Sequence, residues 1–308
     1  MRLITDAEVT SVLDVRSVTD RLDRALGDLG RGRAASTVRV RATADGAMAS
    51  ALAAAWPAGG VTGGKLYATE TGVFTFVVAV FDLEGTLLGI MEGDSLTRIR
   101  TAAGTGVAMR RLLRETPRIA TVIGTGRQCA GHLELLADEF PGLAEVRIVG
   151  RRPGPLEAAY RHGTSLGLRV VTSVDAAAAV EDSDVILTMT SARAPLFPAD
   201  RVQPGALVCA LGSTKADRSE VDPAIAARAD VIVVDSFDGA RRECGDLIAA
   251  ERAGHFAWED VIELASVIAD PQLLAQRTAD GITLFESQGI ALQDVVAGAI
   301  VVERFDQS

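Results

Sequence analysis

The sequence predicts an α/β fold containing a Rossmann-type, doubly wound dinucleotide-binding domain. Residues 119–130 read Ile-Ala-Thr-Val-Ile-Gly-Thr-Gly-Arg-Gln-Cys-Ala, so an apolar strand-like run breaks into Gly124-x-Gly126-x-x-Ala130. A helical stretch and then a second strand, at 145–149, follow this motif. Beyond it, strand-like and helix-like segments alternate, as they do in doubly wound sheets. These three observations together favour the fold more than the motif does alone.

Each small residue of the motif has a mechanical role. Gly124 permits a tight strand-to-helix turn, Gly126 lets a pyrophosphate approach the backbone, and Ala130 lets the helix pack close to the strand. The helix N-terminus offers N–H groups and a positive dipole end to phosphate. The alternative is a glycine turn that binds no ligand. The residues expected to contact a cofactor here are Gly124, Thr125, Gly126, Arg127 and Gln128.

The rest of this domain consists of short apolar runs typical of buried parallel strands, separated by helical stretches. We assign residues 115–284 to the dinucleotide-binding domain. The expected elements after the first strand are helices over 132–140, 154–166 and 174–181, and strands over 145–149, 169–172, 184–189, 206–211 and 229–235.

Residues 1–114 have a different pattern and predict a separate α+β domain. A helix over 289–305, with Asp294 near its start, is expected to return from the dinucleotide domain and pack on this one, so that residues 285–308 complete it. The other expected elements are a helical region over 6–29 capped near Thr5 or Asp6, strands over 36–41, 47–54, 64–68 and 72–82, a hairpin turn over 83–86, and a helix over 95–113.

The composition excludes several classes of protein. The chain has 308 residues, 48% of them hydrophobic, and a net charge of −10, which argues against non-specific nucleic-acid binding. No apolar run approaches the roughly 20 residues that span a bilayer, and no secretory signal is evident. The three cysteines are widely spaced and the three histidines lack metal-ligand spacing, so we expect no disulfide, no metal site and a cytoplasmic protein.

Three basic residues of the N-terminal domain stand where solvated charges would be out of place. Lys65 follows two glycines at the start of an expected strand, and Arg100 lies on a helix of otherwise small residues. Arg39 lies in a strand where alternation places it on the same face as Arg41. Converging Arg and Lys side chains would bind a carboxylate. The alternative is that they are separate surface charges.

Several motifs, in one order along the chain, carry a resemblance to a known family. They are Gly64-Lys65, Leu96-Thr97-x-x-Arg100-Thr101-Ala102-Ala103, Gly124-x-Gly126-x-Gln128-x-Ala130, Gly212-Ser213 with Glu220-x-Asp222, and Phe285-x-Ser287-x-Gly289-x-Ala291-x-Gln293-Asp294. With these motifs the sequence resembles the ornithine cyclodeaminase/μ-crystallin family across nearly its whole length.

The resemblance implies a homodimer, a nicotinamide cofactor in the Rossmann domain, and an amino, imino or keto acid in a cleft between the domains. The N-terminal domain would bind substrate and form the dimer. Arg39, Lys65 and Arg100 match the family's substrate-carboxylate residues, although the usual proline before Arg39 is absent and Arg41 could compete. The family's Met-Pro-Ala is replaced by Ala-Leu-Ala at 51–53.

One departure from the family pattern separates two chemistries. Members that cyclise ornithine carry an aspartate where this chain has Thr214, and that carboxylate would hold and help activate the distal amine. A threonine cannot take up the proton. We therefore expect a reductase or dehydrogenase, with Thr214 lining the substrate. An ornithine or lysine cyclodeaminase, and a low-turnover cofactor-binding protein of the crystallin type, stay open as alternatives.

Cofactor preference is expected at the end of the second Rossmann strand. An acidic residue there would hold the ribose 2′-hydroxyl of NAD, but this chain has Arg151 and Arg152. This favours NADP(H) over NAD(H). The alternative is that Arg152 points to solvent while Arg151 stacks on the adenine. Other expected cofactor contacts are Thr190, Ser191 and Ser213, and, from the resemblance, Ser287 and Gly289.

The expected reaction is hydride transfer between the nicotinamide C4 and the α-carbon of a 2-imino or cyclic ketimine acid, such as pyrroline-2-carboxylate, or of an amino acid. Lys65 and Arg100 would be its catalytic residues. Arg39 and Arg100 would anchor the carboxylate. Lys65 would bind it too, or deliver a proton to nitrogen, because nearby arginines depress the pKa of an ammonium. These two roles of Lys65 stay open.

Overall fold

The computed structural model describes residues 3–70 and 73–306 and divides into two compact units. One unit runs to Val107 and resumes at Gly289, and the other comprises Ala108–Gln288. We call them the smaller and the larger unit. The helix α3 (Asp94–Leu112) begins in the first and ends in the second. Over the residues described, no helix is long and apolar enough to cross a membrane.

The larger unit is built on an eight-stranded sheet in which every pairing is parallel, in the order β10-β9-β8-β11-β12-β15-β13-β14. The predicted α/β class is confirmed. Its strands are β8 (Ile119–Ile123), β9 (Glu145–Val149), β10 (Val170–Ser173), β11 (Val185–Thr188), β12 (Leu207–Ala210), β13 (Ala229–Val234), β14 (Val261–Glu263) and β15 (Ile282–Glu286). Its helices are α4 (Arg127–Glu139), α5 (Pro153–Ser165), α6 (Ala176–Ala179), α7 (Ala224–Arg228), α8 (Phe237–Glu243), α9 (Gly245–Arg252) and α10 (Leu264–Ala269).

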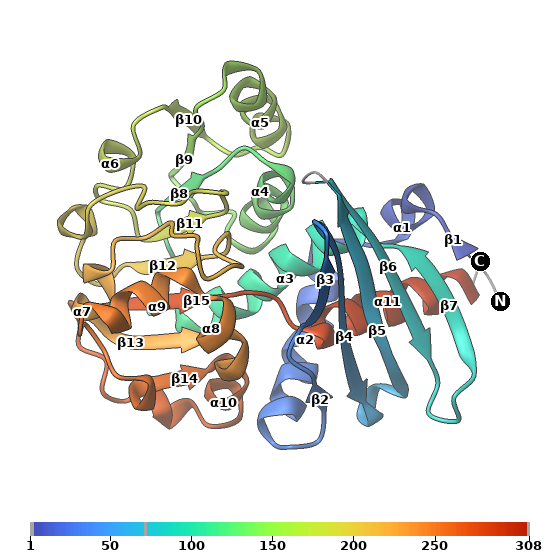
Figure 1. Cartoon of the computed structure of the whole chain (residues 1–308). Coiled ribbons are helices and arrows are strands. Elements are labelled where there is room, and N and C mark those ends of the chain that lie inside the picture. The colour runs from blue at the N-terminus through green and yellow to red at the C-terminus, as the bar shows by residue number, and fades with distance from the viewer. Residues whose placement is uncertain (1–2, 71–72, 307–308) are drawn as a thin grey trace. The chain divides into compact units, whose positions relative to one another are not determined.

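The strand order creates a switch point in this sheet. From β8 the chain adds β9 and then β10 on one side, and later β11 and then β12 on the other (Figure 1). In doubly wound sheets, ligands bind where the order reverses, beyond the carboxyl ends of the strands. The Gly124 turn, which follows β8 directly, lies at this point.

The strands up to β13 follow the prediction, but the four helices α7, α8, α9 and α10 are additional, and other elements differ. The helix α4 begins at Arg127 rather than at 132, and the helix expected over 174–181 is shorter, since α6 spans only Ala176–Ala179. The strands β14 and β15 were not expected. Residues 285 and 286, assigned from the sequence to the other domain, lie in β15, which pairs with both β12 and β13.

The smaller unit contains a seven-stranded, mostly antiparallel sheet with α11 along one face, as Figure 1 shows. The expected return and packing of this C-terminal helix are confirmed by its contacts with β4, β5, β6 and α2. The strands are β1 (Leu3–Ile4), β2 (Ala35–Ser36), β3 (Val40–Ala44), β4 (Ala47–Trp56), β5 (Val61–Glu70), β6 (Val73–Phe81) and β7 (Leu87–Glu92). The helices besides α3 are α1 (Asp6–Val12), α2 (Val15–Gly30) and α11 (Ala291–Asp306).

The cap expected near Thr5 is confirmed by a capping box there, and the helical region over 6–29 consists of two helices, the second capped by Asp14. Two other expectations for the smaller unit need correction. The strand expected over 36–41 is interrupted, so Arg39 lies in the gap between β2 and β3. Lys65 lies in the middle of β5, opposite Leu52 and Val78, rather than at its start. Residue 72, the expected start of a strand, falls outside the described residues.

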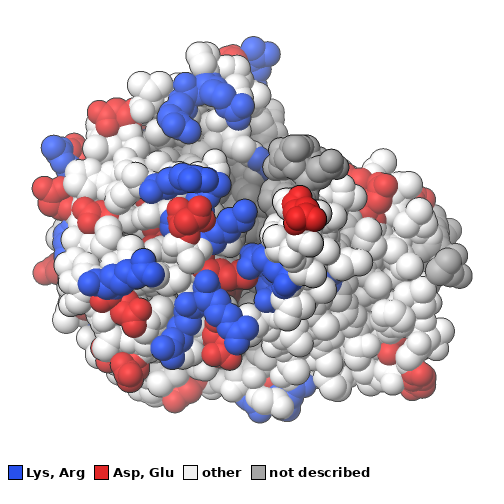
Figure 2. Space-filling view, in the orientation of Figure 1, with Lys and Arg blue, Asp and Glu red and all other residues white. Residues whose placement is uncertain are grey.

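The two faces of this sheet differ. Lys65 is buried on the face that α11 covers, whereas its neighbour Leu66 is 58% exposed. Leu66 belongs to a row of directly paired residues, Val40, Ala51, Leu66 and Val77, that crosses four strands. Val40 and Val77 are exposed as well. In the view of Figure 2, the surface over these strands carries few charged side chains, whereas positive and negative side chains are interspersed over the larger unit.

Candidate active site

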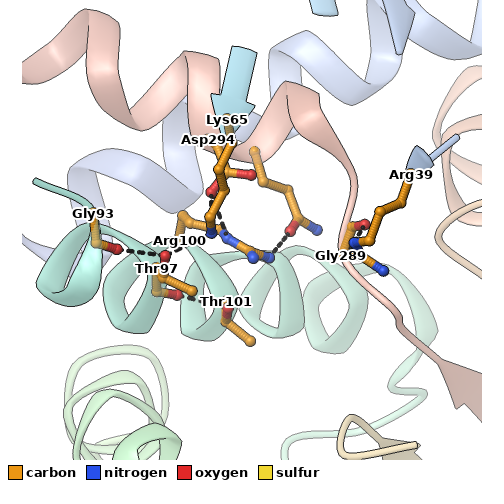
Figure 3. Close-up of polar contacts among 9 residues, drawn as sticks. Arg39, Lys65, Gly93, Thr97, Arg100, Thr101, Gly289 and Asp294 are labelled. Atoms are coloured by element: carbon orange, nitrogen blue, oxygen red, sulfur yellow. Dashed lines mark hydrogen bonds and ion pairs between the residues drawn. The ribbon is translucent and has the colours of Figure 1, made fainter. Parts of the chain in front are cut away.

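Lys65 is the centre of a buried polar cluster in the smaller unit (Figure 3). Lys65 is 3% exposed, and its ammonium donates hydrogen bonds to Thr97 Oγ1 at 2.6 Å and to Asp294 Oδ1 at 3.1 Å. The Phe76 ring centroid lies 4.3 Å from Nζ, within the range of a cation–π contact. The third N–H donor of the ammonium has no hydrogen-bond partner among the described residues.

Arg100 shares the same carboxylate. Its Nε donates to Asp294 Oδ1 at 3.0 Å and its Nη1 to Gln293 Oε1 at 2.6 Å, and the residue is 7% exposed. One aspartate oxygen therefore joins Lys65 on β5 to Arg100 on α3 (Figure 3). The Nη2 group of Arg100 has no hydrogen-bond partner among the described residues, so one side of the guanidinium can receive another acceptor.

Small residues on α3 allow α11 to come close enough for these contacts. A Cβ at Gly104 would lie 2.7 Å from Gln293 Nε2, so a larger residue there would displace the amide that accepts from Arg100. Ala102 and Ala103 are fully buried. The run of small residues that marked this helix in the sequence is therefore a packing requirement.

Arg39 joins the cluster through Gly289. Its Nη2 donates to the Gly289 carbonyl oxygen at 3.3 Å. Gly289 adopts a φ of +82°, and a Cβ there would lie 2.8 Å from Arg100 Nη1, so the glycine allows the two arginines to lie on either side of it. Arg41 lies exposed in β3. The structure thus brings together Arg39, Lys65 and Arg100.

The cluster carries an excess of positive charge, three cations against Asp294. Burial lowers the pKa of Lys65 to about 7, and the charges of Arg100 and Arg39 lower it too, whereas Asp294 raises it. Lys65 can therefore gain or lose a proton near neutral pH. Asp294 was part of a motif in the sequence but had no assigned role, because 229 residues separate it from Lys65.

In the larger unit, the Gly124 turn has the shape that a dinucleotide needs. Gly124 has a φ of +119°, and a Cβ there would lie 2.8 Å from the Met189 carbonyl oxygen, so only glycine fits. A Cβ at Gly126 would meet nothing within 4 Å, which leaves open space over the backbone. Gly126 is the N-cap of α4, and no side chain caps this helix. These residues fit a pyrophosphate group.

Arg151 and Arg152 follow β9 after one residue, Gly150, and are both exposed. Their side chains are therefore accessible to a charged group of a ligand.

Glu220 links two loops that were expected to contact the cofactor. Its buried carboxylate accepts hydrogen bonds from the backbone N–H of Thr190 at 2.5 Å and of Gly212 at 2.7 Å, and from Thr188 Oγ1 at 2.9 Å. Ser191 lies in the first of these loops. Glu220 was noted in the sequence only as part of a motif, and the structure identifies it as the residue that holds these loops together.

Two expected cofactor residues use their hydroxyls inside the protein. Ser213 is 1% exposed, donates to the Arg218 carbonyl oxygen and accepts from the Gly245 N–H. Ser287 donates to Asp235 Oδ2 at 2.7 Å. Contact of either residue with a cofactor would have to leave these bonds in place. Thr214 is half-buried, and its backbone N–H bonds the Gly212 carbonyl oxygen.

The parallel sheet, with its glycine turn at the switch point, places the larger unit among Rossmann-type proteins. The chain belongs to the ornithine cyclodeaminase/mu-crystallin family, whose sequence profile matches residues 3–308.

Relatives within the family have different names. The chain is 30% identical over 234 residues to a Δ1-pyrroline-2-carboxylate reductase of Bacillus cereus, covering 74% of this chain and 70% of that one. It is 32% identical over 229 residues to the ketimine reductase mu-crystallin of Mus musculus, covering 74% and 69%. Matches to other curated relatives cover as little as 64% of their length. A solved structure from Bordetella pertussis, named "probable ornithine cyclodeaminase", is 31% identical with a TM-score of 0.92 and covers 100% of this chain and 97% of that one.

Proposed function

We propose that this protein is an NAD(P)H-dependent reductase of small cyclic 2-imino acids, of the pyrroline-2-carboxylate or piperideine-2-carboxylate type. The observation that carries the proposal is the buried cation cluster, in which Lys65 and Arg100 share Asp294 and keep unused N–H donors. Two relatives that are at least 30% identical, one named a Δ1-pyrroline-2-carboxylate reductase and the other a ketimine reductase, support it. The acid site and the dinucleotide site are assigned to the two units separately, and the reaction needs both.

The donors that Lys65 and Arg100 leave without a partner among the described residues indicate what these two residues would do. The Nη2 face of Arg100 and the guanidinium of Arg39 would hold the substrate carboxylate, because a planar fork matches its geometry. Lys65 would bind the same carboxylate or deliver the proton that makes the imine nitrogen cationic. Asp294 would hold both Lys65 and Arg100 in place. A bound reduced nicotinamide would supply the hydride.

The test is turnover with purified protein. We expect Δ1-pyrroline-2-carboxylate or Δ1-piperideine-2-carboxylate to oxidise reduced nicotinamide, followed by its absorbance, with formation of the cyclic amino acid. Failure with both acids and both cofactors, in a protein that binds the cofactor, would overturn the proposal in favour of a binding protein. Ammonia release from ornithine without net cofactor reduction would identify a cyclodeaminase instead. Thr214, which cannot accept a proton, weighs against that outcome.

We propose NADP(H) as the preferred cofactor. Arg151 and Arg152 are exposed just after β9, and no acidic residue stands there to hold a ribose 2′-hydroxyl. A 2′-phosphate would form charge-assisted hydrogen bonds with them.

We also propose that the protein is a homodimer formed through the open face of the smaller unit's sheet. The row Val40, Ala51, Leu66 and Val77 presents apolar side chains on a face with few charges (Figure 2). A dimer would bury this row against a second copy.

The test of the dimer is its dissociation. Leu66→Glu should shift the mass measured by light scattering from dimer to monomer. Leu83→Glu, a change at an equally exposed leucine in the hairpin turn, should leave the mass unchanged. A monomeric unmodified protein would overturn the proposal.

A further inference from the structure

A second buried cluster, this one acidic, lies in the larger unit. Cys244 and Glu286 are 0% exposed and Asp246 is 2% exposed. Cys244 is the N-cap of α9, Asp246 lies in its first turn, and Glu286 ends β15. One potential ligand atom from each lies within 4.8 Å of the other two, and the Cys244 thiol is 3.2 Å from Glu286 Oε2.

The two carboxylates each present one oxygen that is already held and one that is not. Asp246 Oδ1 accepts from Ser219 Oγ at 2.9 Å and from the backbone N–H groups of Glu220 at 2.7 Å and Val221 at 3.0 Å. Asp246 Oδ2 and Glu286 Oε1 are buried and have no hydrogen-bond partner among the described residues. Asp246 is held as metal-bound carboxylates are, with one oxygen fixed by hydrogen bonds and the other left for an ion. Glu286 Oε2 instead accepts from the Cys244 thiol, and loss of the thiol proton would free this oxygen for the same ion.

The two carboxyl groups have no basic partner. Asp246 and Glu286 are buried, and neither forms an ion pair with a lysine or arginine among the described residues. A buried acid without a counter-charge must carry a proton or lie beside a cation. A single cation at this cluster would compensate both carboxylates.

We propose that Cys244 Sγ, Asp246 and Glu286 bind one zinc ion. A thiolate together with two carboxylates suits Zn²⁺ better than Mg²⁺ or Ca²⁺, which take oxygen ligands only. Three protein ligands leave a fourth position for water. Binding would release the thiol proton and any carboxyl protons to solvent. The widely spaced cysteines gave no sign of this site, because two of its three ligands are carboxylates.

The ion would have a structural role. Asp246 fixes the backbone at Glu220, whose carboxylate holds Thr190 and Gly212, and Glu286 directly precedes Ser287. The zinc would therefore tie α9 to β15 and support the loops at this end of the sheet. This site does not depend on the proposed function, because metal content and stability can be measured without turnover.

The experiment is metal analysis of the full chain refolded with zinc and dialysed against metal-free buffer. We expect about one zinc per chain in the unmodified protein. Refolding with zinc should raise the midpoint of thermal unfolding by about 5 °C or more over refolding without it. With cobalt, a thiolate-to-metal charge-transfer absorption should appear.

The variants distinguish zinc at this cluster from zinc bound elsewhere on the chain. Cys244→Ser should lose the cobalt absorption, and Glu286→Gln, which keeps the side chain's size, should lose the zinc. Cys129→Ser, at a buried cysteine on α4, should keep both. Fewer than about 0.1 zinc per chain in folded unmodified protein would overturn the proposal and leave protons on the carboxyls. Equal zinc in all variants would overturn it too, because the metal would then lie away from these three residues.

Discussion

The two units each bury a charged cluster, but of opposite sign. In the smaller unit, Lys65, Arg100 and Arg39 surround one carboxylate, Asp294. In the larger unit, burial raises the pKa values of Glu220 and Glu286, and the charge of Asp246 raises both further. Neither arrangement is favourable without a ligand, because removing a charge from water costs more free energy than most buried ion pairs regain by attraction.

The difference shows what each cluster is suited to receive. An excess of guanidinium and ammonium donors matches an organic acid, whereas an excess of carboxylate and thiol matches a cation. The first cluster is partly compensated by Asp294, so it can persist without its ligand. The second relies on protonation when no cation is bound. The cation cluster should therefore depend on its carboxylate, and its buried cations should behave differently from cations at the surface.

Replacing Lys65 should have the largest effect. Lys65→Met removes the ammonium but keeps the length of the side chain, so kcat/KM for the imino acid should fall about 10³-fold or more. Cofactor binding, measured by fluorescence titration, should stay within about twofold because Lys65 lies in the other unit. Retained turnover would remove Lys65 from the mechanism.

Removing the shared carboxylate of Asp294 should have the second largest effect. Asp294→Asn leaves Lys65 and Arg100 buried without a counter-charge, which should lower the free energy of unfolding by about 3–5 kcal/mol. It should also lower the pKa of Lys65 further, since Asp294 raises it. Urea unfolding measures the first effect. Glu303→Gln, at an exposed ion pair on the same helix, is the control and should cost less than about 1 kcal/mol. Equal losses for both variants would contradict the central role of Asp294.

The sequence predicted the larger unit well because its strands are buried on both faces. The runs at β8, β11 and β12 are nearly continuous and apolar, and such runs are visible without tertiary information. The strand β15 is hard to predict because its apolar run is short and includes Thr283, and its last two residues are Phe285 and the charged Glu286. The start of α4 was placed too late because its first turn carries polar residues.

The candidate site was only partly predictable. Lys65 and Arg100 stand out locally, as charges among apolar or small neighbours. The role of Asp294 depends on contacts to residues 229 and 194 positions away, which no local pattern reveals. Arg39 was placed in a continuous strand, but it lies at a break in that strand. Its approach to Gly289 is a tertiary contact.

The exposed arginines of the larger unit offer a contrast with the buried cations. Changing Arg151 and Arg152 together to alanine should raise the KM for NADPH about 10- to 100-fold, the value of one or two charge-assisted hydrogen bonds. The KM for NADH should change by less than about threefold, and stability should not change, because both side chains are exposed. Equal weakening of both cofactors would show that the arginines contact a part that NADH and NADPH share.

The pH dependence of the unmodified protein should show the smallest effect, and it tests the protonation state of Lys65. With the pKa of Lys65 at about 7, kcat/KM for reduction should be constant below that pH and fall about tenfold per pH unit above it.

The stability of the folded protein should respond to pH with the opposite sign. The folded-state pKa of Lys65 lies below the usual 10.5, so between about pH 7 and 10.5 the unfolded chain binds a proton at Lys65 that the folded chain does not. The contribution of Lys65 to the free energy of unfolding therefore rises with pH across that window and is lost as the pH falls to about 7. Lys65→Met should abolish the stability slope, which urea unfolding at a series of pH values would measure. A slope that persists in the variant would assign the titration to another group.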